Sequence, residues 1–569
     1  MYDLQPKVQI YEHDTLIIST FSSLKDEPLL IVETYPGVSE NTFDLIKKNH
    51  YDVIIETRDL LYEQEKLNFL LQPFLTDDRV RGRMCFGTIH DFIDPKKLQK
   101  AKDLIKNDQK ILVYGVGASL LSDQGCLVYV DITRWEIQLR YRQGMPNYFL
   151  DNSNEDILKK FKTGYFVEWR IADKIKRQLF ERMDYYVDAT KVNEIKMIPG
   201  QVYLDALNTV AKTPFRLVPY FDPGVWGGDW MSEKFNLPEN GSNYAWSFDG
   251  VPEENSINLG FGSTIIETPA INLVLREPLN LLGQHVYSIY GAEFPIRFDY
   301  LDTMNGQNLS LQVHPSVDLV RREFGLAYTQ SESYYLLDSK DDGVVYLGVK
   351  ENVDKDKMFH DLELANKKEI SFEANKYVNV LPAKKHDHFL IPPGTIHCSG
   401  KNTVVLEISN TPYIFTFKLW DWDRLGLDGL PRPVHLELGK QALDTTIDTK
   451  MVEQELHSPL TILHEEEGLL IEKTGLSSQQ TIETTRVSTN RDVILNNDGR
   501  FSMMNLVEGE ECEIIVGNKQ LHVHYGETFI VPASIDEFTI QTNQPIKVIR
   551  AQIRRFSDEI TSSNRYTNS

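Results

Sequence analysis

Residues 309–315, with the sequence LSLQVHP, alternate apolar and polar side chains. A strand over this segment would place Ser310, Gln312 and His314 on one face and the apolar residues on the other. An amide oxygen of Gln312 and an imidazole nitrogen of His314, two positions apart on that face, suit a shared metal ion. The other interpretation is a half-exposed strand whose polar side chains face water.

Two later segments extend the candidate metal site. Glu332 lies in residues 330–336, whose tyrosines predict a strand that could carry the carboxylate beneath the first strand. His397 follows a turn signal at residues 392–394 and begins another predicted strand. The four side chains Gln312, His314, Glu332 and His397 form a mixed nitrogen and oxygen set that suits zinc or another divalent ion with positions left for substrate.

Several domains must position these residues. The chain has 569 residues, more than one ordinary domain contains, so we predict a multidomain protein. Apolar runs separated by segments with helical spacing predict an N-terminal α/β domain with a parallel sheet, Rossmann-like or P-loop-like; the runs are 29–32, 53–55, 111–116 and 127–130. From about residue 215, short β-rich runs broken by turn residues predict antiparallel sandwiches. The predicted parts are an α/β domain at 1–205, a catalytic sandwich at 206–450, a second sandwich at 451–555 and a polar tail at 556–569.

Composition narrows the classes of function. The chain has 83 acidic and 60 basic side chains and a formal net charge of −23, which disfavours general nucleic-acid binding but leaves room for a local phosphate site. Its four cysteines form no CxxC pair, so we expect reduced thiols in a cytosolic protein rather than a disulfide framework or a zinc ribbon. No signal segment is visible at residues 1–14, and the most apolar stretch, 111–121, is about half of a membrane-spanning length. We therefore predict a cytoplasmic protein without membrane insertion.

Several motifs taken together resemble type I mannose-6-phosphate isomerase, a metal-dependent enzyme of the cupin superfamily. They are residues 310–315, Glu332 eighteen residues after His314, and residues 391–397. Trp-Gly-Gly at 226–228, Asp-Trp-Asp-Arg at 421–424 and Pro-Val-His-Leu at 433–436 are also similar to that family. The resemblance spans about residues 215–554, so it implies a double cupin and leaves the first ~200 residues unexplained.

The resemblance implies roles at single positions. It implies one divalent metal ion, for which we expect zinc, held by Gln312, His314, Glu332 and His397. It implies a phosphate contact at Ser310, proton transfer by Glu407 and a basic active-site position at Arg424. Two positions depart from the family pattern, since Gln330 stands where a Lys is usual and Lys418 where an Arg is usual. These changes should weaken or reshape phosphate recognition, because Arg and Lys are not interchangeable at such sites.

The predicted activity is the interconversion of mannose 6-phosphate and fructose 6-phosphate through a cis-enediol-type intermediate. Glu407 is the predicted acid and base, and Lys418 and Arg424 would steady the phosphate or the enediolate. The alternative, motivated by Gln330 and Lys418, is a sugar-phosphate sensor or regulatory protein whose metal site only binds ligand. The protein could also form a homo-oligomer, which the sequence neither predicts nor excludes.

Two other histidine pairs could bind a metal. They are His386 with His388, and His522 with His524, which alternate along predicted strands. Neither pair has an obvious carboxylate partner at useful spacing in the sequence. We therefore expect surface histidines at these positions.

The N-terminal domain has a weak phosphate-binding signal. Residues 111–119 predict a strand that runs into a glycine-rich turn, but no lysine follows Gly117 as a Walker A loop requires. The basic groups, Arg134, Arg140 and Arg142 with residues 174–177, are similar in outline to those of nucleoside and nucleotide kinases; solvated faces are the other interpretation. We favour a degenerate nucleotide-binding, oligomerising or regulatory domain over an active kinase.

Overall fold

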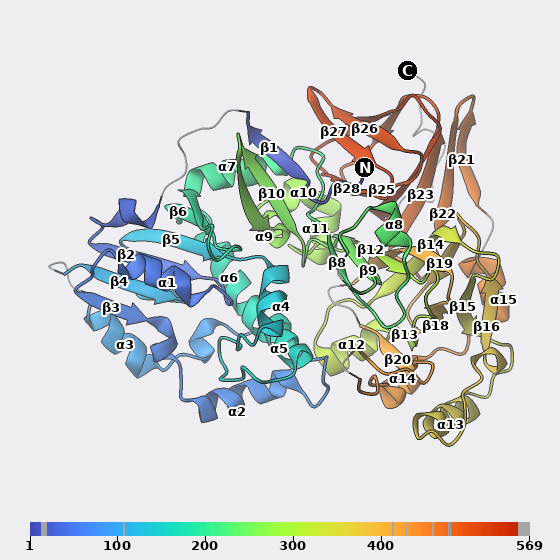
Figure 1. Cartoon of the computed structure of the whole chain (residues 1–569), viewed down its shortest axis with the longest axis horizontal. Helices are drawn as coiled ribbons and strands as arrows, with labels where there is room; N and C mark the ends of the chain where they lie inside the picture. Colours follow the sequence, from blue (N-terminus) through green and yellow to red (C-terminus); the bar gives the residue numbers. More distant parts are fainter. Residues whose placement is uncertain are drawn as a thin grey trace.

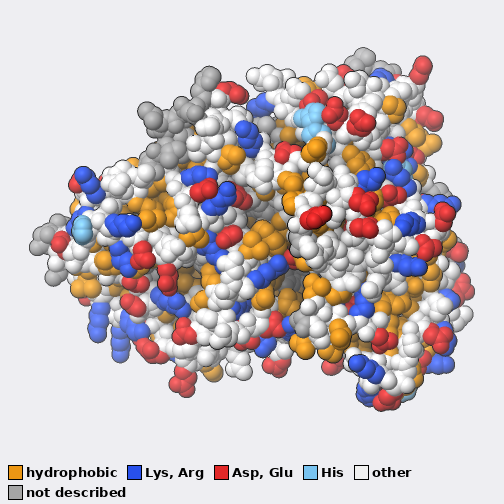
Figure 2. Space-filling model, viewed as in Figure 1, with side chains coloured by type: hydrophobic (Ala, Val, Ile, Leu, Met, Phe, Trp, Pro, Cys, Tyr) orange, Lys and Arg blue, Asp and Glu red, His pale blue; other side chains and the backbone are white. Residues whose placement is uncertain are grey.

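The computed structural model describes residues 1–12, 20–105, 109–239, 241–411, 415–427, 429–457, 460–475, 477 and 479–555. Two lobes lie side by side (Figure 1). The lobe drawn in blue and teal is α/β, and the larger lobe is mainly β. Acidic and basic side chains are interspersed over the face drawn in Figure 2.

The α/β lobe is built on a six-stranded sheet in the order β3-β4-β2-β5-β6-β7. Its strands are β2 (Leu29–Thr34), β3 (Val53–Glu56), β4 (Ile111–Gly115), β5 (Cys126–Asp131), β6 (Tyr185–Asp188) and β7 (Lys196–Pro199). All neighbours pair in parallel except β6 and β7. The predicted parallel sheet is present, and its inner strands are buried on both faces as such sheets require.

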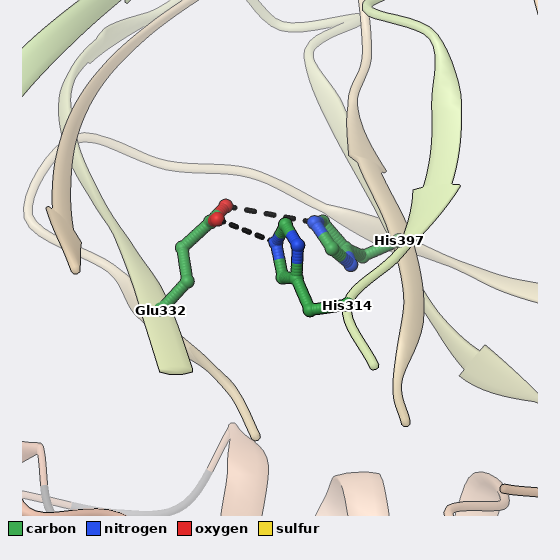
Figure 3. Close-up of side chains that lie close together, drawn as sticks. All are labelled: His314, Glu332 and His397. Carbon is green, nitrogen blue, oxygen red and sulfur yellow. Dashed lines mark hydrogen bonds and ion pairs between the residues drawn. The ribbon is translucent and has the colours of Figure 1, made fainter. Parts of the chain in front are cut away.

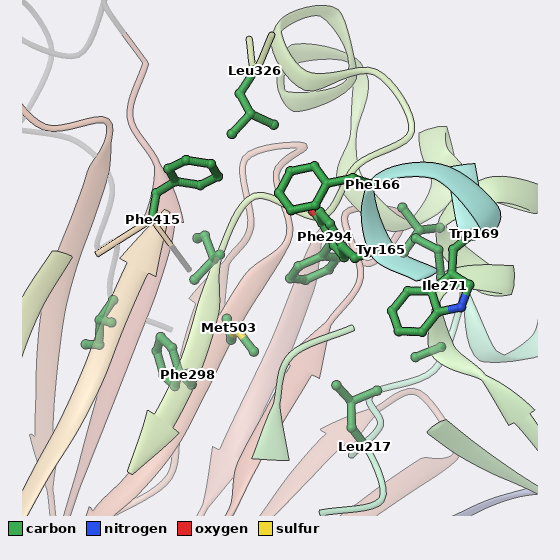
Figure 4. Close-up of a cluster of buried hydrophobic side chains, with 14 of the residues drawn as sticks. Tyr165, Phe166, Trp169, Leu217, Ile271, Phe294, Phe298, Leu326, Phe415 and Met503 are labelled. Carbon is green, nitrogen blue, oxygen red and sulfur yellow. The ribbon is translucent and has the colours of Figure 1, made fainter. Parts of the chain in front are cut away.

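Seven α-helices accompany this sheet within the described residues. They are α1 (Glu40–Lys47), α2 (Gln64–Leu75), α3 (Pro95–Asp103), α4 (Arg134–Arg142), α5 (Ile157–Thr163), α6 (Trp169–Leu179) and α7 (Gly200–Val210). A π-helical turn at Gly164–Glu168 joins α5 to α6, and its five residues are all buried. This turn places aromatic side chains at the boundary with the second lobe, where Figure 4 shows them.

The first strand of the chain lies outside this sheet. β1 (Lys7–Tyr11) pairs in parallel with β10 (Ser256–Phe261), which pairs with β11 (Thr264–Pro269). The predicted range 1–205 for the α/β domain therefore includes a strand that belongs to a different sheet. Hydrophobic alternation cannot reveal this, because it does not encode a partner some 250 residues away.

The middle of the chain forms two facing antiparallel sheets. The six-stranded sheet contains β17 (His388–Ile391), β14 (Ser331–Ser339), β19 (Thr403–Asn410), β12 (Arg297–Asp302), β9 (Trp246–Gly250) and β8 (Tyr220–Asp222) in that order. The five-stranded sheet contains β16 (Val378–Pro382), β15 (Val344–Val349), β18 (Ile396–Ser399), β13 (Leu311–Val313) and β20 (Phe417–Trp420). Glu332 lies in β14, in the sheet that faces β13, so its strand does carry the carboxylate beneath the first one. The candidate site is the space between the two sheets.

Short helices surround this sandwich. They are α8 (Trp230–Lys234), α9 (Ala270–Arg276), α10 (Pro278–Leu282), α11 (Gln284–Tyr290), α12 (Val317–Phe324), α13 (Lys355–Asn366), α14 (Leu436–Ala442) and α15 (Thr449–Met451). α12 follows the helical spacing seen in the sequence at 317–324. It begins after Ser316, whose side chain accepts from the backbone N–H of Leu319, and ends at Gly325 in the left-handed region.

A second antiparallel pair of sheets completes the chain. One contains β21 (Thr461–Glu466), β22 (Leu469–Gly475), β23 (Ile482–Thr489), β30 (Ile546–Ile553), β25 (Ser502–Glu508) and β28 (Thr528–Val531). The other contains β24 (Val493–Asn496), β29 (Glu537–Gln541), β26 (Glu511–Val516) and β27 (Lys519–His524). Among the described residues, no helix has both the length and the apolar character needed to cross a membrane. The tail at 556–569 lies outside the described residues.

Candidate metal centre

Three side chains from separate elements meet between the two central sheets. His314 follows β13, Glu332 lies in β14 and His397 lies in β18. His314 Nε2 is 2.6 Å from Glu332 Oε2, and His397 Nε2 is 3.5 Å from Glu332 Oε1 (Figure 3). All three are buried, and their ligand atoms lie within 4.8 Å of one another. Such convergence is the geometry that a bound metal ion needs.

Gln312 joins this group from β13. It stands directly opposite His397 in the strand register, and its side-chain nitrogen lies 3.3 Å from His397 Nε2. Because the nitrogen and oxygen of an amide are assigned from their surroundings, a turned amide would present its oxygen to the same point. The structure therefore brings together all four residues that the sequence predicts as ligands.

The outer ring nitrogens of both histidines are held by the backbone. His314 Nδ1 lies 3.0 Å from the carbonyl oxygen of Phe415, and His397 Nδ1 lies 2.9 Å from that of Thr395. A carbonyl only accepts, so each Nδ1 donates, and in a neutral ring Nε2 is then the lone-pair atom that faces the centre. This is the arrangement that fixes the tautomer of a metal-binding imidazole.

The electrostatics of the group favour a cation. Burial would raise the pKa of Glu332, but His314 and His397 hold it well below its usual range. Burial lowers the pKa of His397, which keeps that ring neutral. Glu332 Oε1 is buried and accepts no hydrogen bond from the described residues. A buried carboxylate is costly unless positive charge compensates it, so the donor set fits a divalent metal.

A pair of carboxyl groups lies on the same inner face. Glu407 of β19 stands opposite Asp299 of β12 in register. Burial raises the pKa of Asp299 to about 8, and burial with the neighbouring Asp299 and Glu332 raises that of Glu407 well above its usual value. Glu407 is therefore beside another carboxyl group, not beside a lysine as in an ordinary ion-paired strand. Sequence reasoning missed Asp299, whose only signal was its place in an apolar strand.

Gln330 connects the two groups. Its side-chain nitrogen donates to Glu332 Oε2 at 2.8 Å and lies 3.5 Å from Glu407 Oε1, while its oxygen accepts from the backbone N–H of Phe415 at 2.8 Å. A neutral amide thus stands where the resemblance leads one to expect a lysine. It orients Glu332 without adding charge.

A cluster of basic side chains borders the other end of the site. Lys418 stands opposite Gln312 in register, and burial with the nearby Arg432 lowers its pKa to about 7. Ser310 Oγ donates to Asp421 at 2.6 Å, Arg424 pairs with Asp421 at 2.7 Å, and Arg432 donates to Ser310 at 3.1 Å. Arg432 was not predicted from the sequence, although it lies three residues before His435 in a segment similar to the family.

The rival histidine pairs differ from the expectation in part, since His522 is exposed as predicted. His388 is buried and bonds to Ser333 and Thr474, so its prediction as a surface residue is wrong. His386 Nε2 lies 2.5 Å from Glu508, a carboxylate that adjacency in sequence could not reveal. His522 and His524 lie close to Glu511, an exposed residue, so this pair also has a carboxylate partner.

The glycine-rich turn of the α/β lobe binds an internal carboxylate. The N–H groups of Gly117 and Ser119 donate to Glu33 at 2.5 and 2.8 Å. The basic groups are engaged as well, with Arg134 on Asp173 and Lys176 on Asp131. Arg134 and Lys176 are thus internal ion pairs, whereas Arg142 and Arg177 are exposed, as the interpretation of a solvated face expects. The amides that the sequence offered to a phosphate have a partner within the protein.

Comparisons with known proteins give one match within the N-terminal part and several matches to isomerases over more than half of the chain. A family described as a domain of unknown function, DUF8485, matches residues 17–212. Mannose-6-phosphate isomerase ManA of Bacillus subtilis is 24% identical over 333 residues, which are 58% of this chain and 96% of that protein. Mannose-6-phosphate isomerase of Streptococcus mutans is 22% identical over 313 residues, or 55% and 90% of the two chains. The resemblance to mannose-6-phosphate isomerases is confirmed.

Solved structures match the chain as well, among them two isomerases. The mannose 6-phosphate isomerase from Bacillus subtilis matches 60% of this chain and 100% of its own, with 19% identity and a TM-score of 0.49. A mutant of phosphomannose isomerase from Salmonella typhimurium matches 60% and 100%, with 12% identity and a TM-score of 0.44.

Proposed function

We propose that this protein is a metal-dependent aldose–ketose isomerase that interconverts mannose 6-phosphate and fructose 6-phosphate. The observation that carries the proposal is the convergence of Gln312, His314, Glu332 and His397 between two sheets, with Glu407 on the same inner face. The relatives named mannose-6-phosphate isomerase, which the chain matches over almost their whole length, support the same reaction. Both sandwiches are cupins in this proposal.

The four ligands would hold one divalent ion, for which zinc suits the two imidazoles and two oxygen donors. When bound, the ion supplies a positive charge that polarises the sugar oxygens. Carbonyl contacts at Nδ1 fix the orientation of His314 and His397, so that each Nε2 faces the centre. Gln330 holds Glu332 in place.

Proton transfer would fall to Glu407. The reaction removes a weakly acidic proton from one carbon and returns it to the neighbouring carbon, so one group must accept and then donate it. A raised pKa suits a carboxyl group for both steps, and burial beside Asp299 provides it. Ser310, Lys418 and Arg424 would bind the phosphate or steady the enediolate, at the end of the site where positive charge collects.

A coupled isomerase assay on the full-length, zinc-loaded protein tests the proposal, together with a metal analysis. We expect one metal ion per chain and conversion of mannose 6-phosphate well above a metal-free control. Tight binding of mannose 6-phosphate without turnover would instead favour the sugar-phosphate sensor, which Gln330 and Lys418 motivate. Absence of both binding and turnover would refute both.

A further inference from the structure

A second group of histidines and carboxylates lies on the outer face of the C-terminal sandwich. Glu511 and Glu513 of β26 stand directly opposite His524 and His522 of β27 in the strand register. Cys512, between the two glutamates, belongs to the core, so alternation along the strands turns these four polar side chains outward. Figure 2 shows histidine side chains beside carboxylates over these two strands. We call the four side chains the β26–β27 cluster.

The ligand atoms of this cluster lie close together, as those of the central site do. One ligand atom each of Glu511, His522 and His524 lies within 4.8 Å of the other two. His522 Nε2 is 3.1 Å from Glu511 Oε2, and the centres of the two imidazole rings are 4.4 Å apart. Two imidazole nitrogens and one carboxylate oxygen form a donor set that zinc and other divalent transition metals bind.

Each histidine of the cluster is also held by a carboxylate at Nδ1. His522 Nδ1 bonds to Glu513, and His524 Nδ1 lies 3.2 Å from Glu527 Oε1. Glu527 is fully buried, accepts from the backbone N–H of His524 at 2.8 Å and pairs with Arg216 at 2.8 Å. A carboxylate that accepts from Nδ1 fixes the ring and leaves Nε2 of a neutral imidazole as the lone-pair atom. Both rings therefore have the outer partner that metal-binding histidines usually have.

The negative charge of the cluster has little compensation. Within the part of the chain that the structure describes, Glu511 and Glu513 form ion pairs with His522 but with no lysine or arginine. Glu513 Oε2 is buried and accepts no hydrogen bond from the described residues. The hydrogen bond with Glu513 raises the pKa of His522, so a proton holds this place when no metal ion is bound. A divalent ion carries twice the charge of that proton and would displace it.

We propose that the β26–β27 cluster is a second metal site, which binds a divalent transition metal such as zinc through His522, His524 and Glu511. Glu513 and Glu527 orient the two rings at Nδ1. The site lies on other strands than the central ligands, so the proposal does not depend on the isomerase function. Its ligands come from two neighbouring strands, and β27 is the edge strand of its sheet. A bound ion would therefore fasten this edge strand to β26.

The second site should bind its ion more weakly than the central one. The side chains of His522 and Glu511 are 42% and 54% exposed, whereas the histidines and the carboxylate of the central site are buried. Water screens the charges of an exposed site and weakens their attraction for a cation. We therefore expect the central ion to remain through gel filtration, and the second ion to bind only while zinc is present in solution.

Calorimetric titration of zinc into the full-length protein, with the central site already filled, tests this proposal. Wild type should take up one further ion per chain. His522→Ala and Glu511→Ala should each weaken this uptake at least about a hundredfold, because each removes a ligand, and Glu513→Ala should weaken it about 10- to 100-fold, because it removes an outer partner. Calcium should bind far more weakly than zinc, since it prefers oxygen ligands to imidazole.

His464→Ala serves as the control. His464 lies on β21 of the same sandwich, is partly exposed and pairs with Glu466 at 3.3 Å. H464A should bind the second zinc ion as wild type does. H522A should keep the central ion and the wild-type isomerase activity, and His397→Ala should still bind zinc at the β26–β27 cluster.

The proposal is overturned if wild type with a filled central site takes up no second zinc ion, or if both H522A and E511A take it up as wild type does. It is also overturned if calcium binds as tightly as zinc, because the carboxylates would then bind a cation without the imidazoles. A failed isomerase assay would refute the proposed function alone, since these titrations measure zinc binding and not turnover.

Discussion

Replacing His397 by alanine should remove most of the metal affinity. The ring is fully buried, its Nδ1 is fixed by Thr395, and its Nε2 faces Glu332 Oε1 at 3.5 Å. His397→Ala leaves Gln312, His314 and Glu332 around the same point. Loss of an outer partner of a metal ligand typically weakens affinity by about 10- to 100-fold, so loss of the ligand itself should cost at least about a hundredfold.

The loss of zinc affinity can be measured as a loss of the stabilisation that zinc gives to the folded protein. Zinc at a hundred times its dissociation constant stabilises a folded protein by about 2.7 kcal/mol. After a hundredfold loss of affinity the same concentration only equals the dissociation constant, and the stabilisation falls to about 0.4 kcal/mol. Denaturant unfolding with and without zinc measures both values, and elemental analysis should show that H397A no longer retains an ion.

His388→Ala is the matched control. His388 is also buried and lies on β17, but its ring bonds to Ser333 and Thr474 instead of the metal ligands. H388A should lower the stability of the metal-free protein and leave the zinc-dependent increment intact. If H397A keeps the full increment, or if H388A loses as much of it, the ligand assignment is refuted.

Two further changes test the carboxyl groups. Glu407→Gln should lower kcat about 10²- to 10⁴-fold with mannose 6-phosphate binding retained in calorimetry, because it removes the proton-transferring group; unchanged kcat would exclude that role. Burial raises the pKa of Glu33 to about 7, so the folded protein holds a proton that the unfolded chain releases near pH 4.5. Wild type should therefore lose up to about 3 kcal/mol of stability relative to Glu33→Gln as pH rises from 4.5 to 8, in urea unfolding. Parallel pH profiles would contradict the buried Glu33.

The sequence by itself predicted the local structure and the identity of the candidate ligands. Apolar runs such as residues 111–116 predict buried parallel strands, because a strand covered on both faces needs apolar side chains at every position. The glutamine and the histidine of residues 309–315 stand out because burying a polar side chain costs free energy unless it has a partner. These signals are local, because each is visible in one segment without knowing which other segment packs against it.

Only the tertiary structure decided which elements meet. It placed Glu332 in the sheet opposite His314, set Glu407 beside Asp299, and engaged the glycine-rich turn with Glu33. It also brought Arg81 to β20 across more than 300 residues of sequence. Periodicity records how deeply a residue is buried and in which local conformation, but the partner of a buried charge is chosen by packing between distant segments.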